Sequence, residues 1–194
     1  MLRSPGASGV VYGQRLVRAL MELDQHVLLT ISESGRQVLK HERRVDVDLT
    51  QFQLADLLEG DVPRSGQTDY FYYQDFMTPI ASGSHRTRGM VVCPCSGSTL
   101  SGIATASSSN LIQRAADVHL KERRQLILVP RETPLSLIQL DNMKRVTEAG
   151  AIVLPASPGF YHGAERVEQL VDFVVARILD QLDIEHQLTQ RWGD

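Results

Sequence analysis

Four short apolar runs do not alternate with polar residues, and they limit the folds that this chain can adopt. The runs are residues 26–31 (HVLLTI), 89–94 (GMVVCP), 125–130 (QLILVP) and 150–155 (GAIVLP). A strand that is apolar on both faces is typical of a parallel sheet that helices cover on both sides. We therefore predict that these segments are strands of one buried parallel sheet.

Helical periodicity separates the predicted strands. The final helix is expected to bury a face that runs from Val167 to Leu182. An earlier helix shows the same pattern at Tyr12, Leu16, Leu20 and Leu23. Alternating strands and helices predict a doubly wound α/β fold.

The chain has 194 residues and shows no internal repeat and no linker, so we expect one domain over residues 1–194. Residues 43–80 are its least regular part. We expect a short helix there and an excursion before the sheet resumes.

Composition argues against several classes of protein. The net charge of −3 disfavours general nucleic-acid binding. No apolar stretch approaches the roughly 20 residues of a membrane helix, and residues 1–9 lack the apolar core of a signal peptide. We expect a cytoplasmic protein with no membrane partner. Cys93 and Cys95 are wrongly spaced for a zinc pair or an unstrained disulfide, so we expect reduced thiols and no metal site.

Small polar residues follow every predicted strand and precede the first helix. These clusters are residues 6–9 (GASG), 32–35 (SESG), 95–102 (CSGSTLSG), 131–134 (RETP) and 156–163 (ASPGFYHG). Open α/β sheets bind ligands beyond the carboxyl ends of their strands, so we expect the clusters to converge. Hydroxyls and N–H groups at helix N-termini suit a phosphate, although the same residues are also ordinary caps and turns. No GxGxxG or Walker loop occurs, which disfavours a nicotinamide cofactor or ATP.

Basic side chains supply a further candidate anion site. Arg114 and Lys121 are seven residues apart, so they would share one face of a helix. A solvated charged face is the alternative for this helix. Arg177 lies between apolar residues of the last helix, where an arginine either extends to solvent or is paired. A bound phosphate would satisfy it.

The third predicted strand ends in an unusual turn. Arg131 and Glu132 stand between Pro130 and Pro134, where a plain turn would use Gly, Asn or Asp. The prolines restrict the backbone, and adjacent side chains of an extended segment point in opposite directions. We predict that Arg131 and Glu132 address two sides of a site. The alternative is a local surface salt bridge.

Taken together, these motifs resemble those of the UbiX-type flavin prenyltransferases. The matching stretches are GASG (6–9), ASGS (81–84), CPCSGSTLSGIA (93–104), RAADVHLKERR (114–124), VPRETPL (129–135), PGFYH (158–162) and RWG (191–193). The resemblance implies a flavodoxin-like (Rossmann-like) three-layer α/β sandwich with a parallel sheet. Only Met1 to Pro5 precede Gly6, and Pro5 stands where the family has Ser or Thr, so we expect a truncated first strand.

The resemblance also implies an activity. Family members transfer a dimethylallyl group from dimethylallyl phosphate to N5 and C6 of reduced FMN. The prenylated FMN then serves a partner UbiD-type decarboxylase of the ubiquinone pathway type. Family members form large homo-oligomers, commonly dodecamers, with sites at subunit contacts. No metal is required.

Roles for individual residues follow from the matching motifs alone. Ser8, Glu42 and Glu132 would be catalytic. The FMN site would consist of Gly6, Ala7, Ser8, Ser32, Ser96, Gly97, Ser98, Thr99 and Arg131. The donor phosphate site would consist of Ser82, Arg114, Lys121, Tyr161 and Arg177.

Two alternatives remain open. A flavin-dependent decarboxylase of cysteine-containing peptides shares the fold and an FMN site. Such enzymes carry a catalytic histidine after the first helix, which is not found here, and they lack LKERR. The protein could instead be a flavin-binding subunit with no turnover.

Overall fold

The computed structural model describes residues 9–160 and 163–189. Its strands are β1 (His26–Leu29), β2 (Gln67–Tyr70), β3 (Gly89–Cys95), β4 (Gln125–Pro130) and β5 (Ile152–Val153). Its helices are α1 (Val10–Glu22), α2 (Glu33–Arg43), α3 (Leu54–Leu57), the 3-10 helix η1 (Pro79–Ala81), α4 (Gly97–Ala104), α5 (Leu111–Lys121), α6 (Leu137–Glu148) and α7 (Val167–Gln181).

All strand pairs are parallel, as predicted, but the described strands form two sheets rather than one. One sheet has the order β1–β2 and the other has the order β3–β4–β5. The four predicted apolar runs all contain strands. β2 was not predicted, because Gln67 and Asp69 make it polar and it pairs only at one edge. The expected short helix between residues 43 and 80 is α3.

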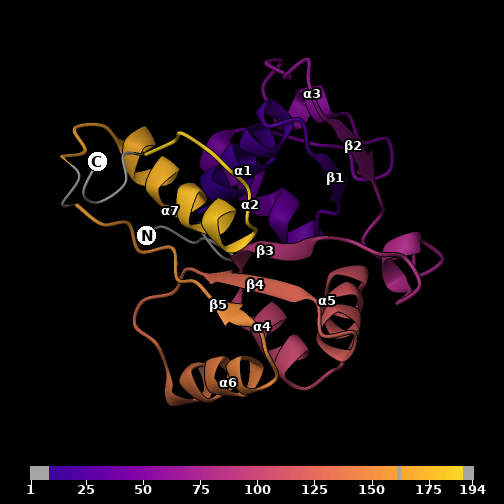
Figure 1. Cartoon of the computed structure of the whole chain (residues 1–194). Helices are drawn as coiled ribbons and strands as arrows, with labels where there is room; N and C mark the ends of the chain where they lie inside the picture. Colours follow the sequence, from indigo (N-terminus) through magenta and orange to yellow (C-terminus); the bar gives the residue numbers. More distant parts are fainter. Residues whose placement is uncertain (1–8, 161–162, 190–194) are drawn as a thin grey trace.

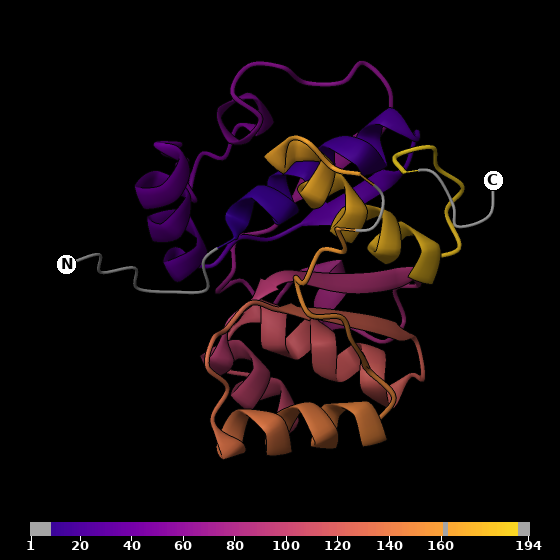
Figure 2. The same ribbon diagram turned by 90° about the vertical axis from the view of Figure 1, so that its left-hand side faces the viewer.

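Helices cover both faces of the β3–β4–β5 sheet (Figure 1). Ile127 and Val129 of β4 pack with α1 and α7 in one core cluster. Leu126 and Leu128 pack with α4, α5 and α6 in another. Successive side chains of a strand point to opposite faces, so a continuous apolar run serves both layers. Figure 2 shows the same layers from the side.

Helix α1 belongs to both halves of the molecule. Leu16 and Ala19 face the cluster around α7, while Val17 and Met21 face a separate cluster with β1 and α2. The helix also approaches β3 closely, since a Cβ added at Gly13 would lie 2.7 Å from the Cys93 carbonyl oxygen. Any larger residue there would push α1 away from the strand.

In the part of the chain that the structure describes, no helix is long and apolar enough to cross a membrane.

Candidate active site

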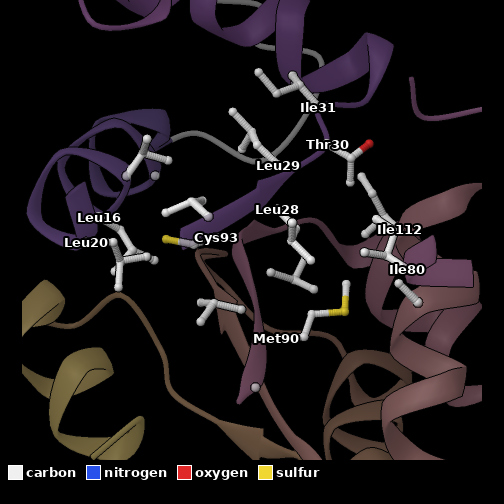
Figure 3. Close-up of a pocket in the computed structure, with 18 of the residues that line it drawn as sticks. Leu16, Leu20, Leu28, Leu29, Thr30, Ile31, Ile80, Met90, Cys93 and Ile112 are labelled. Carbon is white, nitrogen blue, oxygen red and sulfur yellow. The ribbon is translucent and has the colours of Figure 1, made fainter. Parts of the chain in front are cut away.

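A cavity of about 570 Å³ separates the two sheets. Side chains from β1, β3, α1 and α5 line it, as Figure 3 shows. Most of the lining is apolar. Polar residues gather where the strands end, at Ser32 and Ser34 beyond β1 and at Ser96 and Thr99 beyond β3. Three of the residues predicted to bind FMN, Ser32, Ser96 and Thr99, therefore line the same cavity.

The start of α4 has the geometry of an anion site. Ser96 is the N-cap, and its Oγ accepts the Thr99 N–H at 3.2 Å. The Ser96 hydroxyl also lies 3.0 Å from the hydroxyls of Ser98 and Thr99. The first N–H groups of a helix have no acceptor within it, and the helix dipole favours negative charge there. A phosphate could bind to these groups and hydroxyls.

The end of β1 supplies a second helix start. Ser32 caps α2 by accepting the Gly35 N–H at 3.1 Å. Thr30, just before it, has a buried hydroxyl with no hydrogen-bond partner in the described residues. Thr30 was not among the predicted site residues, although it is the one hydroxyl inside the apolar run HVLLTI. Such a hydroxyl is costly to bury unless a ligand or neighbouring chain segment meets it.

A polar cluster surrounds the start of α1. Glu42 accepts the Gly9 N–H at 3.0 Å, and the space beside Gly9 is bounded by the Tyr12 ring and the Arg131 side chain. Burial raises the pKa of Tyr12, the nearby Cys93 raises it further, and Arg131 opposes the rise. Glu42 and Arg131, predicted for different roles, thus lie at the same helix end.

The β4 turn presents its two charged residues differently. Pro130 is the last residue of β4 and is buried. Arg131 is partly buried against the start of α1, whereas Glu132 is exposed and accepts the Thr133 N–H at 3.3 Å. The two side chains thus lie in different surroundings, and their address to two sides of a site stays a prediction.

Two predicted donor-site residues, Ser82 and Arg114, lie near each other beside α5. Arg114 donates from Nε to the Ala81 carbonyl at 3.1 Å, next to the exposed Ser82. Lys121, seven residues further along α5, pairs with Glu122 at 3.0 Å. Arg114 also pairs with Asp117 at 3.3 Å. Such surface ion pairs are what the alternative of a solvated charged face predicts, so a shared donor site stays a prediction.

Arg124, three residues after the end of α5, holds the segment that follows Ser82, a role that was not predicted. Its guanidinium donates to the carbonyls of Gly83 and His85, the latter at 2.6 Å. A Cβ at Gly83 would overlap the Glu122 carboxylate, so this glycine permits the close approach. The sequence does not show which main-chain carbonyls an arginine side chain will reach, so this contact could not be predicted.

Arg177 lies elsewhere in the chain. It pairs with Asp180 at 2.7 Å and lines a separate cavity of about 330 Å³ with Pro155, Ser157 and Phe173. The pairing is one of the two outcomes predicted for this arginine. The described contacts of one chain do not join Arg177 to Arg114 or Lys121. Gly6, Ala7, Ser8 and Tyr161 lie outside the described residues.

Both cysteines are free thiols. Burial raises the pKa of Cys93 to about 12, and the neighbouring Cys95 adds to the rise. Cys93 borders the cavity, but such a thiol stays protonated and is a poor nucleophile or metal ligand. Within residues 9–160 and 163–189, no group of three or more His, Cys, Asp or Glu side chains is placed to hold a metal ion.

Comparison with known proteins places the chain in a family. The family model described as Flavoprotein matches residues 1–179. The flavin prenyltransferase UbiX of Pseudomonas aeruginosa is 48% identical over 194 residues, which is 100% of this chain and 93% of that protein. The UbiX of Halalkalibacterium halodurans is 46% identical over 190 residues, 97% of this chain and 90% of its own.

Solved structures agree with these sequence matches. A crystal structure of AnUbiX (PadA1) in complex with FMN and dimethylallyl pyrophosphate is similar at a TM-score of 0.84 and 38% identity, covering 97% of this chain and 94% of its own. A dodecameric FMN-dependent UbiX-like decarboxylase from Escherichia coli O157:H7 gives a TM-score of 0.83 at 38% identity, covering 97% and 96% of the two chains. The chain therefore belongs to the flavoprotein family and, within it, to the flavin prenyltransferases of the UbiX type.

Proposed function

We propose that this protein transfers a dimethylallyl group from dimethylallyl phosphate to N5 and C6 of reduced FMN. The observation that carries the proposal is the convergence of Ser32, Ser96 and Thr99 on one cavity mouth, in a chain of this family. The hydroxyls and helix N-termini that follow β1 and β3 at this place suit the phosphate of a flavin mononucleotide.

The residues at this mouth fit FMN. Ser96, Gly97, Ser98 and Thr99 would hold the phosphate with N–H groups and hydroxyls, and Ser32 would act from the β1 side. Arg131 would add a positive charge beside them, and Gly6, Ala7 and Ser8 would complete the site. When bound, reduced FMN supplies the N5 and C6 atoms that accept the prenyl group.

The donor phosphate would be neutralised by Arg114, Lys121 and Arg177, with Ser82 and Tyr161 as hydrogen-bond donors. Monophosphate leaves readily only when its growing charge is stabilised, which cations and an acid can do. Glu132 would deliver a proton to the departing phosphate oxygen. Glu42 of α2, which accepts the Gly9 N–H ahead of α1, and Ser8 would hold or move a proton on the flavin side.

We infer that several copies of the chain complete this site. Arg177 lies on α7, whereas Ser82, Arg114 and Lys121 lie beside α5, so one copy could add its α5 residues to the site of the next. Exposed apolar side chains support self-association, with Leu137 and Ile138 each 73% exposed and Met77 94% exposed. The dodecameric relative supports a homododecamer.

The finer features of the family are part of the same proposal. The complete fold would be a flavodoxin-like three-layer sandwich in one domain, and the protein would act in the cytoplasm. Its product would pass to a UbiD-type decarboxylase, as the family resemblance implies.

Anaerobic addition of dimethylallyl phosphate to the protein with reduced FMN tests the proposal. A change in the flavin absorption spectrum that requires both protein and donor is expected. A spectrum that responds to FMN alone would instead indicate a flavin-binding subunit, and release of CO₂ from a cysteine-containing peptide would indicate the decarboxylase alternative.

A further inference from the structure

The end of α7 carries three polar side chains that contact one another in a row. Arg177 Nη1 donates to Asp180 Oδ2 at 2.7 Å, and His186 Nε2 lies 3.2 Å from Asp180 Oδ1. One carboxylate therefore joins an arginine to a histidine. The side chains become more buried along the row, from Arg177 at 53% exposed through Asp180 at 24% to His186 at 3%. The row thus runs from the surface into the protein.

Hydrogen bonding determines which nitrogen of His186 carries the proton. The Leu188 N–H donates to His186 Nδ1 at 3.3 Å. A main-chain N–H can only donate, so Nδ1 holds the lone pair and Nε2 holds the proton of a neutral ring. The Asp180 carboxylate accepts from that Nε2. The imidazole therefore orients the carboxylate without adding a charge of its own.

Apolar neighbours hold His186 in place. Ile184 is buried in the core cluster that α1, β4 and α7 share, and Leu188 packs against the same cluster. The Ile184 N–H also donates to the Leu179 carbonyl at 3.0 Å. A side chain between two anchored residues is a rigid support for the groups that it contacts. His186 is thus a fixed point to which Asp180 is bonded.

Arg177 is a side chain that needs such a support. An arginine is long and flexible, and a half-exposed ion pair within one helix contributes little by itself. Arg177 borders the 330 Å³ cavity together with Ser157 and Phe173. Among the residues that the structure describes, Asp180 is its only ion-pair partner. A guanidinium has five N–H donors, so most of them remain for a ligand in this cavity.

We propose that Asp180 and His186 are positioning residues for Arg177. His186 fixes Asp180, and Asp180 aligns the guanidinium so that its other N–H groups meet the phosphate of the prenyl donor. This last point rests on the proposed function, which places the donor phosphate at Arg177. The alternative is that the pair only closes the end of α7, and its loss would then change stability with no specific effect on the donor.

The test measures binding of dimethylallyl phosphate to the full protein loaded with oxidised FMN, by calorimetry, so that no transfer occurs. His186→Leu fills the space but cannot donate to Asp180. It should weaken donor binding about tenfold, the typical worth of one hydrogen bond to a charged group. FMN affinity should stay constant. His186→Gln restores an N–H near the Nε2 position and should bind the donor almost as the wild type does.

The Arg177→Leu background shows whether His186 acts through the arginine. A positioning residue has no further effect once the group that it positions is gone, so adding His186→Leu there should cost no more donor affinity. Equal losses with and without Arg177 would overturn the proposal. So would unchanged donor binding by His186→Leu in the wild-type background.

Asp180→Asn is a second variant, which keeps the shape of the side chain. An amide has a single oxygen, so it cannot accept from Arg177 and His186 together. Loss of a negative charge would by itself strengthen phosphate binding, so weaker donor binding reflects lost alignment. Tighter binding by Asp180→Asn would overturn the proposal.

Asp172→Asn on the same helix is the matched control. Asp172 is also 24% exposed and accepts from Arg15 at 2.6 Å. This variant loses an arginine partner of the same kind and should bind the donor as the wild type does. A loss of donor affinity equal to that of Asp180→Asn would overturn the proposal.

The same titrations separate the two claims. A wild-type protein that binds FMN but no dimethylallyl phosphate would contradict the proposed function, and the inference with it. Donor binding that falls in Arg177→Leu but not in His186→Leu or Asp180→Asn would contradict the inference alone.

Discussion

Glu132 is exposed just beyond the end of β4, so a substrate can reach its carboxylate. Glu132→Gln keeps the shape of the side chain and removes the transferable proton. Prenyl transfer should slow by at least about tenfold, since general acid catalysis typically contributes about 10²–10⁴-fold. FMN binding should not change. Single-turnover rates with saturating FMN measure the effect.

The control for this substitution is Glu148→Gln, which alters an exposed glutamate on α6 that pairs with Lys144. It should transfer the prenyl group at the wild-type rate. Transfer at that rate by Glu132→Gln as well would mean that the charged turn after β4 is structural.

His119 on α5 is a buried histidine that the packing keeps neutral. Its Nδ1 donates to the Ala115 carbonyl and its Nε2 accepts from Thr87, both at 2.8 Å. Burial lowers its pKa, the nearby Arg124 lowers it further, and the bond to Ala115 opposes both.

The pKa of His119 is lower in the folded chain than in the unfolded chain. Below about pH 6.5 the unfolded chain therefore binds a proton at this histidine more readily than the folded chain does. The stability that neutral His119 contributes is therefore complete above about pH 6.5 and is lost as the pH falls. His119→Gln should reduce the fall in unfolding free energy between about pH 7 and 5, by at most about 1.4 kcal/mol per pH unit. Denaturant unfolding across this range measures it, and an unchanged slope would contradict the assignment.

At the scale of elements, the start of α4 is both a cap and a proposed phosphate site. Ser96→Ala with Thr99→Val removes two hydroxyls and should abolish copurification of FMN. Loss of the cap alone should cost about 1 kcal/mol of unfolding free energy. Flavin absorbance of the purified protein and thermal unfolding measure the two effects.

Asn110 provides a matched control, because its side chain caps α5 by accepting the Gln113 N–H at 3.0 Å. Asn110→Ala should lose similar stability and keep FMN. Retention of FMN by the Ser96 and Thr99 variant would remove the α4 turn from the site.

Arg124 joins the loop of residues 83–85 to α5, and this loop follows Ser82. Arg124→Gln should cost roughly 1.5–3 kcal/mol of stability, the typical worth of hydrogen bonds from a charged donor. It should also raise the KM for dimethylallyl phosphate severalfold while FMN affinity stays constant. The adjacent exposed Arg123→Gln should change neither. Equal loss of FMN and donor binding would show a general folding defect.

Most elements could be predicted because burial on two faces leaves a clear pattern. The run at residues 125–130 coincides with β4, whereas that at 150–155 holds only the two-residue strand β5. β2 could not be found, because Gln67, Thr68 and Asp69 read as a loop. Its strand character comes from pairing with β1, a contact between distant segments.

At the scale of the whole molecule, the division into two sheets is the main departure from the expected fold. The 570 Å³ cavity lies between the two sheets, with side chains of β1 on one side and of β3 on the other. Sequence periodicity indicates buried strands but not where a gap between them opens, so this division could not be predicted.

The candidate site was predictable only in part. Turn chemistry indicated that Ser32, Ser96 and Thr99 would meet at one edge, because strand direction fixes where loops emerge. Sequence could not show that Arg177 and Arg114 lie apart within one chain. Their meeting would depend on contacts between copies, which no local pattern encodes.

Mass spectrometry of the flavin after anaerobic incubation tests the central claim most directly. The protein, reduced FMN and dimethylallyl phosphate are incubated together, and the flavin is released and weighed. The proposed function predicts that FMN gains one five-carbon prenyl unit, and that omitting either the protein or the donor prevents the gain. FMN of unchanged mass, with protein folded and flavin bound, would contradict it.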